Sequence, residues 1–212
     1  MNKYQFGAIS EEKFYLCISE DKRKMTTANP TIITSDLAAE LKQAIGNHPG
    51  HDCYVLTDTN THQRCLPYLY SCGLPADSRI ITVEAGDEHK NIEAAVRIWE
   101  VLGGSGATRK SLFINLGGGM ITDLGGFAAS TFKRGIRYLN LPTSLLGAVD
   151  AATGGKTGIN LNGLKNEVGV FNPAERTLID VHFFRSLDAY NLRSGYAEMV
   201  KHALIDTVDE WK

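Results

Sequence analysis

The sequence lacks several features that would assign it to a special class of protein. No apolar run approaches the roughly 20 residues of a membrane-spanning helix, and residues 1–28 do not have the layout of a secretory signal. The cysteines Cys17, Cys53, Cys65 and Cys72 form no Cys-x-x-Cys pair, so neither a zinc knuckle nor a disulfide framework is expected. The net charge of -2 argues against a broadly basic surface for nucleic acid. We expect a cytoplasmic protein with reduced thiols, no membrane contact and no nucleic-acid partner.

The remaining composition is that of a folded protein with an uneven distribution of glycine. The chain has 212 residues, 43% of them hydrophobic and 22% charged. At this length a globule buries about 70% of its unfolded surface and needs no covalent staples. Many of the 21 glycines fall in short clusters between residues 103 and 169. Glycine clusters beside apolar segments indicate tight turns or backbone that approaches a ligand.

Apolar segments of strand length alternate with segments of helix length. Strands are predicted at 54–57, 79–83, 112–116, 138–141 and 177–180, and helices at 35–45, 62–72, 91–102, 120–132 and 191–205. Ser35 is the expected cap of the first helix. The alternation predicts an α/β fold with a Rossmann-like parallel sheet that helices cover on both faces. Ligands of such sheets bind at the carboxyl ends of the strands, where the strand order reverses.

Two segments depart from this alternation. Residues 1–28 are mostly polar, and we expect them to be a weakly ordered extension. Residues 153–169 are rich in glycine and asparagine and poor in apolar side chains, which is typical of a functional loop.

A glycine triplet, Gly117 to Gly119, stands between a predicted strand and a predicted helix. Glycines there let a pyrophosphate approach the backbone, and the helix N-terminus supplies free N–H groups. A tight strand-to-helix turn explains the triplet equally well. Asp123, one turn into the helix, favours a ligand site because it can meet a ribose or substrate hydroxyl. The alternative is that Asp123 only complements the helix dipole.

Polar residues also follow the two preceding strands. Asp58 and Asn60 stand where polar groups would meet the ribose of a bound nucleotide, and an Asx turn is an equally good explanation. Gly86 to Lys90 is a charged loop that we interpret by default as a solvated turn.

Basic residues lie in and around the glycine-rich segment. Lys156, Lys165 and Asn166, with Asp150 ahead of them, have almost no acidic neighbours in the sequence. This setting predicts a pocket for an anionic group such as phosphate, since an ammonium serves as a point charge for it. The alternative is a flexible surface loop with ordinary lysines.

On the last predicted helix, Glu198, Lys201 and His202 stand at i, i+3 and i+4 and so share one face. The plainer interpretation, a surface Glu–Lys pair, is favoured by the sequence alone. The sharper one makes Glu198 a metal ligand with His202 as a second ligand one turn later.

Taken together, these segments resemble the 3-dehydroquinate synthase family. The order and spacing of the motifs agree from Gly117 to Lys201, and the resemblance extends weakly back to Thr31. The matching stretches are 117–127, 133–135, 141–146, Asp150, 154–158, 163–166 and 195–201. Asp87 stands where many relatives have Glu, and Ser144 where many have Thr; both keep an acceptor oxygen.

The resemblance implies an organisation and a set of roles. After the expected extension at 1–28, which matches nothing in the family, it implies an NAD-binding α/β domain at 29–185, and at 186–212 the start of a helical C-terminal domain that is largely missing. The implied NAD contacts are Asp58, Asn60, Asp87, Lys90, Gly118, Gly119, Asp123, Thr143, Ser144, Lys165 and Ser186.

The resemblance also implies a substrate and metal site. Asp150 would lie between nicotinamide and substrate, and Lys156 and Asn166 would hold the substrate phosphate. The remaining implied roles are contact with that phosphate across a homodimer interface for Arg134, the carboxylate side of the substrate for Lys201, and one of three zinc (or cobalt) ligands for Glu198. The other two metal ligands would lie outside this chain.

The activity implied by the resemblance is that of a carbon–oxygen lyase. It converts DAHP, a seven-carbon keto-acid phosphate, to 3-dehydroquinate and phosphate in the shikimate pathway of aromatic amino-acid biosynthesis, with NAD and a metal. With two metal ligands outside it, we expect the chain to be inactive alone. The alternatives are a sibling cyclase for sedoheptulose 7-phosphate, a polyol dehydrogenase, and a non-catalytic NAD-binding module.

Overall fold

The structure, a computed structural model, describes residues 31–46 and 52–205. The expected extension at 1–28, with Cys17, lies outside the described residues. Six parallel strands form one sheet, in the order β1 (Thr31–Ile33), β8 (Arg176–Ile179), β5 (Arg137–Pro142), β4 (Leu112–Gly117), β2 (Cys53–Asp58) and β3 (Arg79–Val83). The chain passes from β2 outward to β3 and then continues on the other side of β2 with β4, so the strand order reverses between β2 and β4.

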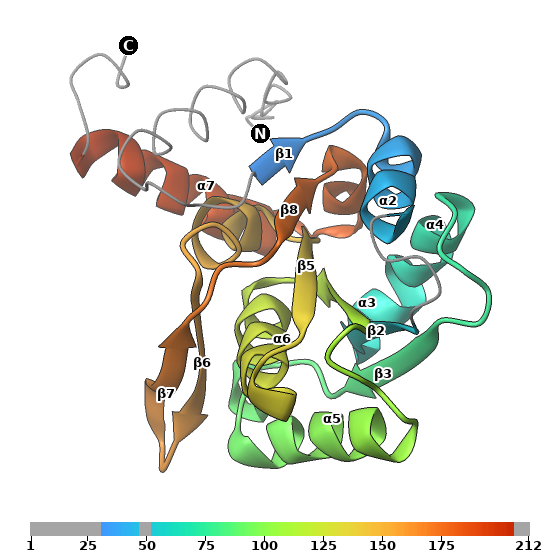
Figure 1. Cartoon of the computed structure of the whole chain (residues 1–212). Helices are drawn as coiled ribbons and strands as arrows, with labels where there is room; N and C mark the ends of the chain where they lie inside the picture. The colour runs from blue at the N-terminus through green and yellow to red at the C-terminus, as the bar shows by residue number, and fades with distance from the viewer. Residues whose placement is uncertain (1–30, 47–51, 206–212) are drawn as a thin grey trace.

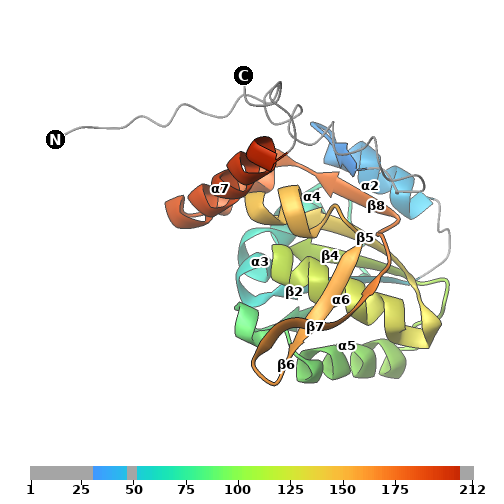
Figure 2. The same cartoon turned by 90° about the vertical axis from the view of Figure 1, so that its left-hand side faces the viewer.

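Helices cover both faces of this sheet (Figures 1 and 2). The helices are α2 (Leu37–Gly46), α3 (Thr59–Arg64), α4 (Leu66–Ser71), α5 (Ile92–Gly104), α6 (Gly119–Thr131) and α7 (Ala189–Ile205). Short 3-10 turns are η2 (Asp87–His89), η3 (Phe132–Arg134) and η5 (Val181–Ser186), and a π-helical turn, η4, spans Gly147–Ala151. The predicted fold class is therefore confirmed.

The packing of the core explains why the sequences of the central strands are runs of apolar residues. Alternate side chains of a strand point to opposite faces. Phe113 of β4 packs with α5 and α6 on one face, whereas Leu112 and Ile114 pack with α2 and α4 on the other. Because helices bury both faces, all six residues of β4 and of β2 are buried.

The predicted helix at 62–72 is wrong in detail, because two helices occupy this stretch. Asp58 caps α3, which therefore begins at Thr59. The helix breaks at Cys65, and Pro67 stands in the first turn of α4, where its missing N–H costs nothing. The expected cap of the first helix is also displaced by one residue: Oδ1 of Asp36, not Ser35, accepts the N–H of Ala39 (3.0 Å).

The glycine-rich segment 153–169 is not a loop as expected. It forms most of an antiparallel hairpin of β6 (Lys156–Leu161) and β7 (Leu164–Phe171), which lies along α6 and extends away from the sheet (Figures 1 and 2). Asn162 and Gly163 make the turn with φ of 51° and 80°, as a two-residue hairpin turn requires. Most of β7 is exposed, and its apolar side chains Leu164 and Phe171 are exposed with it.

In the described part of the chain, no helix combines the length and apolar character needed to cross a membrane.

Candidate functional site

The carboxyl edge of the sheet gathers most of the residues that the sequence singles out. Asp58 ends β2, Gly117 ends β4, and Thr143 follows β5. Lys90 comes after β3 and η2, and Ser186 ends η5 after β8. Because β2 and β4 flank the point where the strand order reverses, Asp58 and the glycine triplet lie where ligands of such sheets bind.

The glycine triplet has a packing role besides any ligand role. Gly118 is the N-cap of α6 and supplies no side-chain cap to its first turn. A Cβ on Gly118 would lie 3.0 Å from Ser144 Oγ, and one on Gly147 would lie 3.0 Å from Gly119 N. Close packing between the triplet and the segment 144–147 therefore explains why Gly118 and Gly147 are glycines. The first N–H groups of α6 remain free of a side-chain cap.

The contacts of Asp58 agree in part with the alternative interpretation of this segment as an Asx turn. Its Oδ1 accepts the N–H groups of Asn60 and Thr61, both at 2.8 Å, and Thr61 Oγ1 accepts the N–H of Asp58 at 3.0 Å. These bonds fix the turn that carries the exposed Asn60 to the edge of the sheet. They leave Asp58 Oδ2 outside the capping contacts.

Lys90 is buried at the centre of a network, and its interpretation as part of a solvated turn is wrong. Its side chain is 5% exposed, and Nζ donates to Asp123 Oδ2 (2.9 Å) and to Asn166 Oδ1 (2.6 Å). Asp87 Oδ1 lies 3.6 Å from the same Nζ, and Lys165 Nζ pairs with Asp87 Oδ2 at 2.8 Å. We call Asp87, Lys90, Asp123, Lys165 and Asn166 the Lys90 cluster.

Sequence reasoning missed Asn160, which ties the hairpin to this cluster. Its side-chain amide donates to Asp87 O (2.9 Å), its Oδ1 accepts the N–H of Asn166 (3.0 Å), and its N–H donates to Lys90 O (2.7 Å). The only available signal was an asparagine within the glycine-rich segment.

The electrostatics of the Lys90 cluster differ between its two carboxylates. Burial raises the pKa of Asp123 above its usual value, and Lys90 opposes this effect. The hydrogen bond from Lys165 lowers the pKa of Asp87, and the same contact raises the pKa of Lys165. Electrostatic repulsion from Asp150 and Asp87 also acts to raise the pKa of Asp123.

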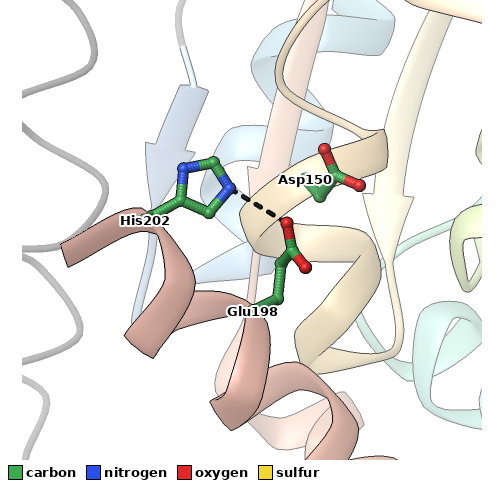
Figure 3. Close-up of side chains that lie close together, drawn as sticks. All are labelled: Asp150, Glu198 and His202. Atoms are coloured by element: carbon green, nitrogen blue, oxygen red, sulfur yellow. Dashed lines mark ion pairs between the residues drawn. The ribbon is translucent and has the colours of Figure 1, made fainter. Parts of the chain in front are cut away.

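A second polar group lies where α7 packs on η4; Asp150, Glu198, Lys201 and His202 are called the Asp150 cluster below. One ligand atom from each of Asp150, Glu198 and His202 can be chosen so that all lie within 4.8 Å of one another. Figure 3 shows Glu198 and His202 projecting from α7 toward the turn that carries Asp150. His202 Nε2 is 3.3 Å from Glu198 Oε1, and Lys201 Nζ contacts the same oxygen and thereby has its pKa raised.

Close backbone packing creates this second group. Gly195 of α7 is buried against Leu145 and Leu146, and a Cβ there would lie 2.6 Å from Leu146 N. Met199 adds an apolar contact with Leu145 and Ala148. The predicted Glu198–Lys201 pair thus exists, with Lys201 exposed to solvent and Glu198 largely buried beside Asp150.

The two lysines expected to share a phosphate pocket are held apart. Lys156 pairs with Phe171 at the open end of the hairpin, whereas Lys165 follows the turn. At about 3.3 Å per residue these ends are roughly 13 Å apart along the strands. Lys165 engages Asp87, and Lys156 is exposed at the base of the hairpin.

Arg134 also lies away from the sheet edge. It stands beyond the far end of α6, a 13-residue helix, which is about 20 Å from the glycine triplet at 1.5 Å per residue. Arg134 is exposed, and it and Lys133 have left-handed φ values of 67° and 48°.

The remaining polar residues at the edge have structural contacts. Ser144 Oγ accepts the N–H of Gly147 (3.1 Å), and Thr143 N donates to Gly117 O (2.9 Å). Ser186 Oγ donates to Phe183 O (2.8 Å) within η5. These contacts fix the loops at this edge of the sheet.

A chain of buried, hydrogen-bonded amide side chains, which sequence reasoning also missed, links β4 and β5 to the end of η4. Asn115 of β4 donates to Asn140 Oδ1 of β5 (2.9 Å), and Asn140 donates to Ala152 O (3.4 Å) at the end of η4. Thr177 of β8 also donates to Ala152 O (2.9 Å).

Comparison with known proteins identifies the family. The family model described as 3-dehydroquinate synthase N-terminal matches residues 80–194. The chain belongs to the 3-dehydroquinate synthase family. It is 49% identical over 180 residues to the 3-dehydroquinate synthase of Parabacteroides distasonis, an alignment that covers 85% of this chain and 51% of that protein. The chain therefore spans about half the length of this curated relative.

Members of this family with other names are also similar to the chain. The 2-epi-5-epi-valiolone synthase of Streptomyces albus is 39% identical over 170 residues, covering 78% of this chain and 41% of that protein. A solved 2-epi-5-epi-valiolone synthase from Streptomyces hygroscopicus, with NAD+ and Zn2+ bound, superposes with a TM-score of 0.70 at 28% identity, covering 82% of this chain and 49% of that one. A 2-deoxy-scyllo-inosose synthase shares the fold with a TM-score of 0.77 at 24% identity, covering 84% and 49%.

Proposed function

We propose that this chain is the NAD-binding half of a 3-dehydroquinate synthase, which converts DAHP to 3-dehydroquinate and phosphate. The observation that carries the proposal is the junction of two groups at one sheet edge. The open N-terminus of α6 and the Lys90 cluster adjoin the Asp150 cluster, which contains carboxylates, a lysine and a histidine. This combination suits a dinucleotide beside a metal-bound, anionic substrate.

The residues at the edge fit NAD. The uncapped first turn of α6, beginning at Gly118 and Gly119, offers N–H groups and a positive dipole to the pyrophosphate. We assign Asp58, the last residue of β2, and Asn60, in the first turn of α3, to the adenosine ribose. We further assign NAD contacts to Asp87, Lys90, Asp123, Thr143, Ser144, Lys165 and Ser186.

The Asp150 cluster fits the metal and the reacting end of the substrate. Carboxylate and imidazole groups are ligands that zinc and cobalt accept, and Glu198 is the ligand we assign from this chain. Lys201 is assigned to the carboxylate side of the substrate and Asp150 to the space between nicotinamide and substrate. When bound, NAD accepts and returns a hydride while the metal polarises the substrate oxygen as a Lewis acid.

The substrate phosphate is assigned to Lys156 and Asn166, with Arg134 reaching it from a second copy of the chain. The position of Arg134 supports this arrangement, because it stands exposed about 20 Å from the glycine triplet on a left-handed backbone. Left-handed conformations of non-glycine residues are strained and concentrate at functional sites. The proposal therefore includes a homodimer.

The test is phosphate release from DAHP with NAD and zinc supplied. We propose that the 212-residue chain releases none, while the product of the complete reading frame releases phosphate only when both cofactors are present. Steady release by the 212-residue chain would overturn the proposed inactivity. Release that needs neither cofactor would overturn the proposed reaction.

A second candidate is a sibling cyclase that acts on sedoheptulose 7-phosphate. It is favoured by the 39% identity to a 2-epi-5-epi-valiolone synthase. Offering DAHP and sedoheptulose 7-phosphate to the same preparation separates the two candidates. Binding of NAD with consumption of neither sugar would instead support a non-catalytic NAD-binding module.

A further inference from the structure

The β6–β7 hairpin is irregular opposite Asn160. The register of the ladder shifts there, so that residues 165–167 of β7 stand opposite Asn160 alone, and Asn166 among them has a left-handed φ of 55°. Adjacent side chains of a regular strand point to opposite faces, but Lys165 and Asn166 both contact the same short segment, 87–90. A bulge re-aims side chains in this way, and bulges are over-represented beside active sites.

The side chain of Asn160 fixes this bulge to the segment 87–90. Its Oδ1 accepts the N–H of Asn166 (3.0 Å), and its Nδ2 donates to Asp87 O (2.9 Å). The backbone N–H of Asn160 donates to Lys90 O (2.7 Å) instead of to β7. One partly buried residue thus joins the hairpin to a segment 73 residues away in the chain.

Lys90 fixes which way the side-chain amide of Asn166 points. Nζ of Lys90 can only donate, so the atom 2.6 Å from it is the acceptor Oδ1 of Asn166. The Nδ2 of Asn166 therefore points away from Lys90, and it donates to none of the described residues. Because Asn166 is exposed, this amide presents its N–H donors outward, which is the polarity that an anion such as phosphate requires.

We propose that Asn160 is a positioning residue, which touches neither ligand and couples the phosphate contact of Asn166 to the NAD contacts of Asp87 and Lys90. The inference rests on the proposed function, which supplies the two ligands. A ligand that orders one of the two segments also orders the other through Asn160, so the second ligand binds at a smaller entropic cost. The coupling is reciprocal: phosphate should strengthen NAD binding by the same factor by which NAD strengthens phosphate binding.

The first test is calorimetric titration of the 212-residue chain with NAD, with and without inorganic phosphate. In the parent chain, phosphate should lower the dissociation constant of NAD by about fivefold or more. This ratio should fall close to one in Asn160→Ala. Asn162→Gly is the matched control, because it removes the same side chain from the tip of the same hairpin and keeps the left-handed turn (φ 51°), so its ratio should stay that of the parent. A merely structural role would weaken NAD binding equally with and without phosphate, so an unchanged ratio in Asn160→Ala overturns the inference.

A second variant and a measurement without ligands guard against loss of folding. Asn160→Asp keeps the acceptor for the N–H of Asn166 and loses the donor to Asp87 O. Amide hydrogen exchange of Asn166, followed by NMR, should therefore stay slow in Asn160→Asp and become fast in Asn160→Ala, while the coupling ratio falls in both. Equal exchange in Asn160→Ala and the parent chain would contradict the positioning role. If the parent chain binds no NAD, the proposed function fails and the coupling with it, whereas NAD binding with a ratio of one contradicts the inference alone.

Discussion

The two polar clusters at the carboxyl edge of the sheet differ in how their charged side chains are partnered. In the Lys90 cluster two ammonium groups meet two carboxylates, and Lys90 donates to both Asp123 and Asn166. In the Asp150 cluster two carboxylates meet one ammonium and an imidazole, and two buried atoms have no hydrogen bond. The first is fully partnered among the described residues, whereas the second is not.

This difference indicates which part of the site is rigid before a ligand binds. A fully partnered network rigidifies its surroundings, while a partly satisfied one is costly until its missing partner binds. We therefore expect the Lys90 cluster to act as a clamp between the hairpin, η2 and α6, and the Asp150 cluster to depend on an added cation. The predictions below test this contrast, from the largest expected effect to the smallest.

Removing the ammonium at the centre of the Lys90 cluster should cost the most. Lys90→Met leaves Asp123, whose side chain is only 19% exposed, as an uncompensated buried charge. Breaking a buried pair in this way costs about 3–5 kcal/mol of unfolding free energy, measurable by urea denaturation. The control is Lys165→Met, which removes the same charge from a side chain that is 76% exposed and should change stability little. Equal losses in the two variants would contradict the clamp.

The buried amide chain that links β4 and β5 to η4 should contribute to stability. Asn140→Leu leaves the buried amide of Asn115 without its acceptor, for a loss of about 1–3 kcal/mol of unfolding free energy, whereas Ala152 O keeps the hydroxyl of Thr177. Thr131→Val provides a control, because the Thr131 hydroxyl donates to carbonyls within α6. Urea denaturation measures both variants, and equal losses would contradict a role for the amide chain.

The smallest effect should be the acid sensitivity of the Lys90 cluster. The hydrogen bond from Lys165 lowers the pKa of Asp87 in the folded chain. Its contribution to stability is therefore complete above the unfolded pKa of about 3.9 and is lost as the pH falls through the lower folded value. Because Asp87 is 43% exposed, the contribution is small. Comparing the acid unfolding of Asp87→Asn with that of the parent chain measures it, and identical profiles would contradict it.

Asp123 should behave in the opposite sense. Burial raises its pKa, so its charge lowers the stability of the ligand-free chain at neutral pH. This penalty is relieved as the pH falls through the raised folded pKa toward the unfolded one.

The sequence predicts the sheet well and the clusters poorly, for a physical reason. The strand at 112–116 carries its signal locally, in a run of apolar residues that helices bury on both faces, whereas the edge strand at 79–83 carries it in alternating buried residues, Ile81 and Val83. The burial of Lys90 depends on Asp123 and Asn166, which lie 33 and 76 residues away in the chain. No local pattern encodes such a meeting, so a buried lysine was interpreted as a solvated one.

The expected loop at 153–169 was wrong for a different reason, because the sequence does contain a signal for the hairpin. Asn162-Gly163 is a strong two-residue turn signal, and it lies between segments that contain Ile159 and Val168. The low apolar content of 153–169 outweighed this signal, although the exposed strand β7 itself carries Leu164, Val168, Val170 and Phe171. For the Asp150 cluster, the helical spacing of Glu198 and His202 was visible, but the approach of Asp150 depends on packing that the sequence does not reveal.

That packing passes through Gly195, where a Cβ would lie 2.6 Å from Leu146 N. One absent methyl group thus sets how closely α7 approaches η4. Even alanine at this position would wedge α7 outward and separate Glu198 from Asp150, without touching a charge. The spacing of these two carboxylates is therefore adjustable by a residue that has no side chain.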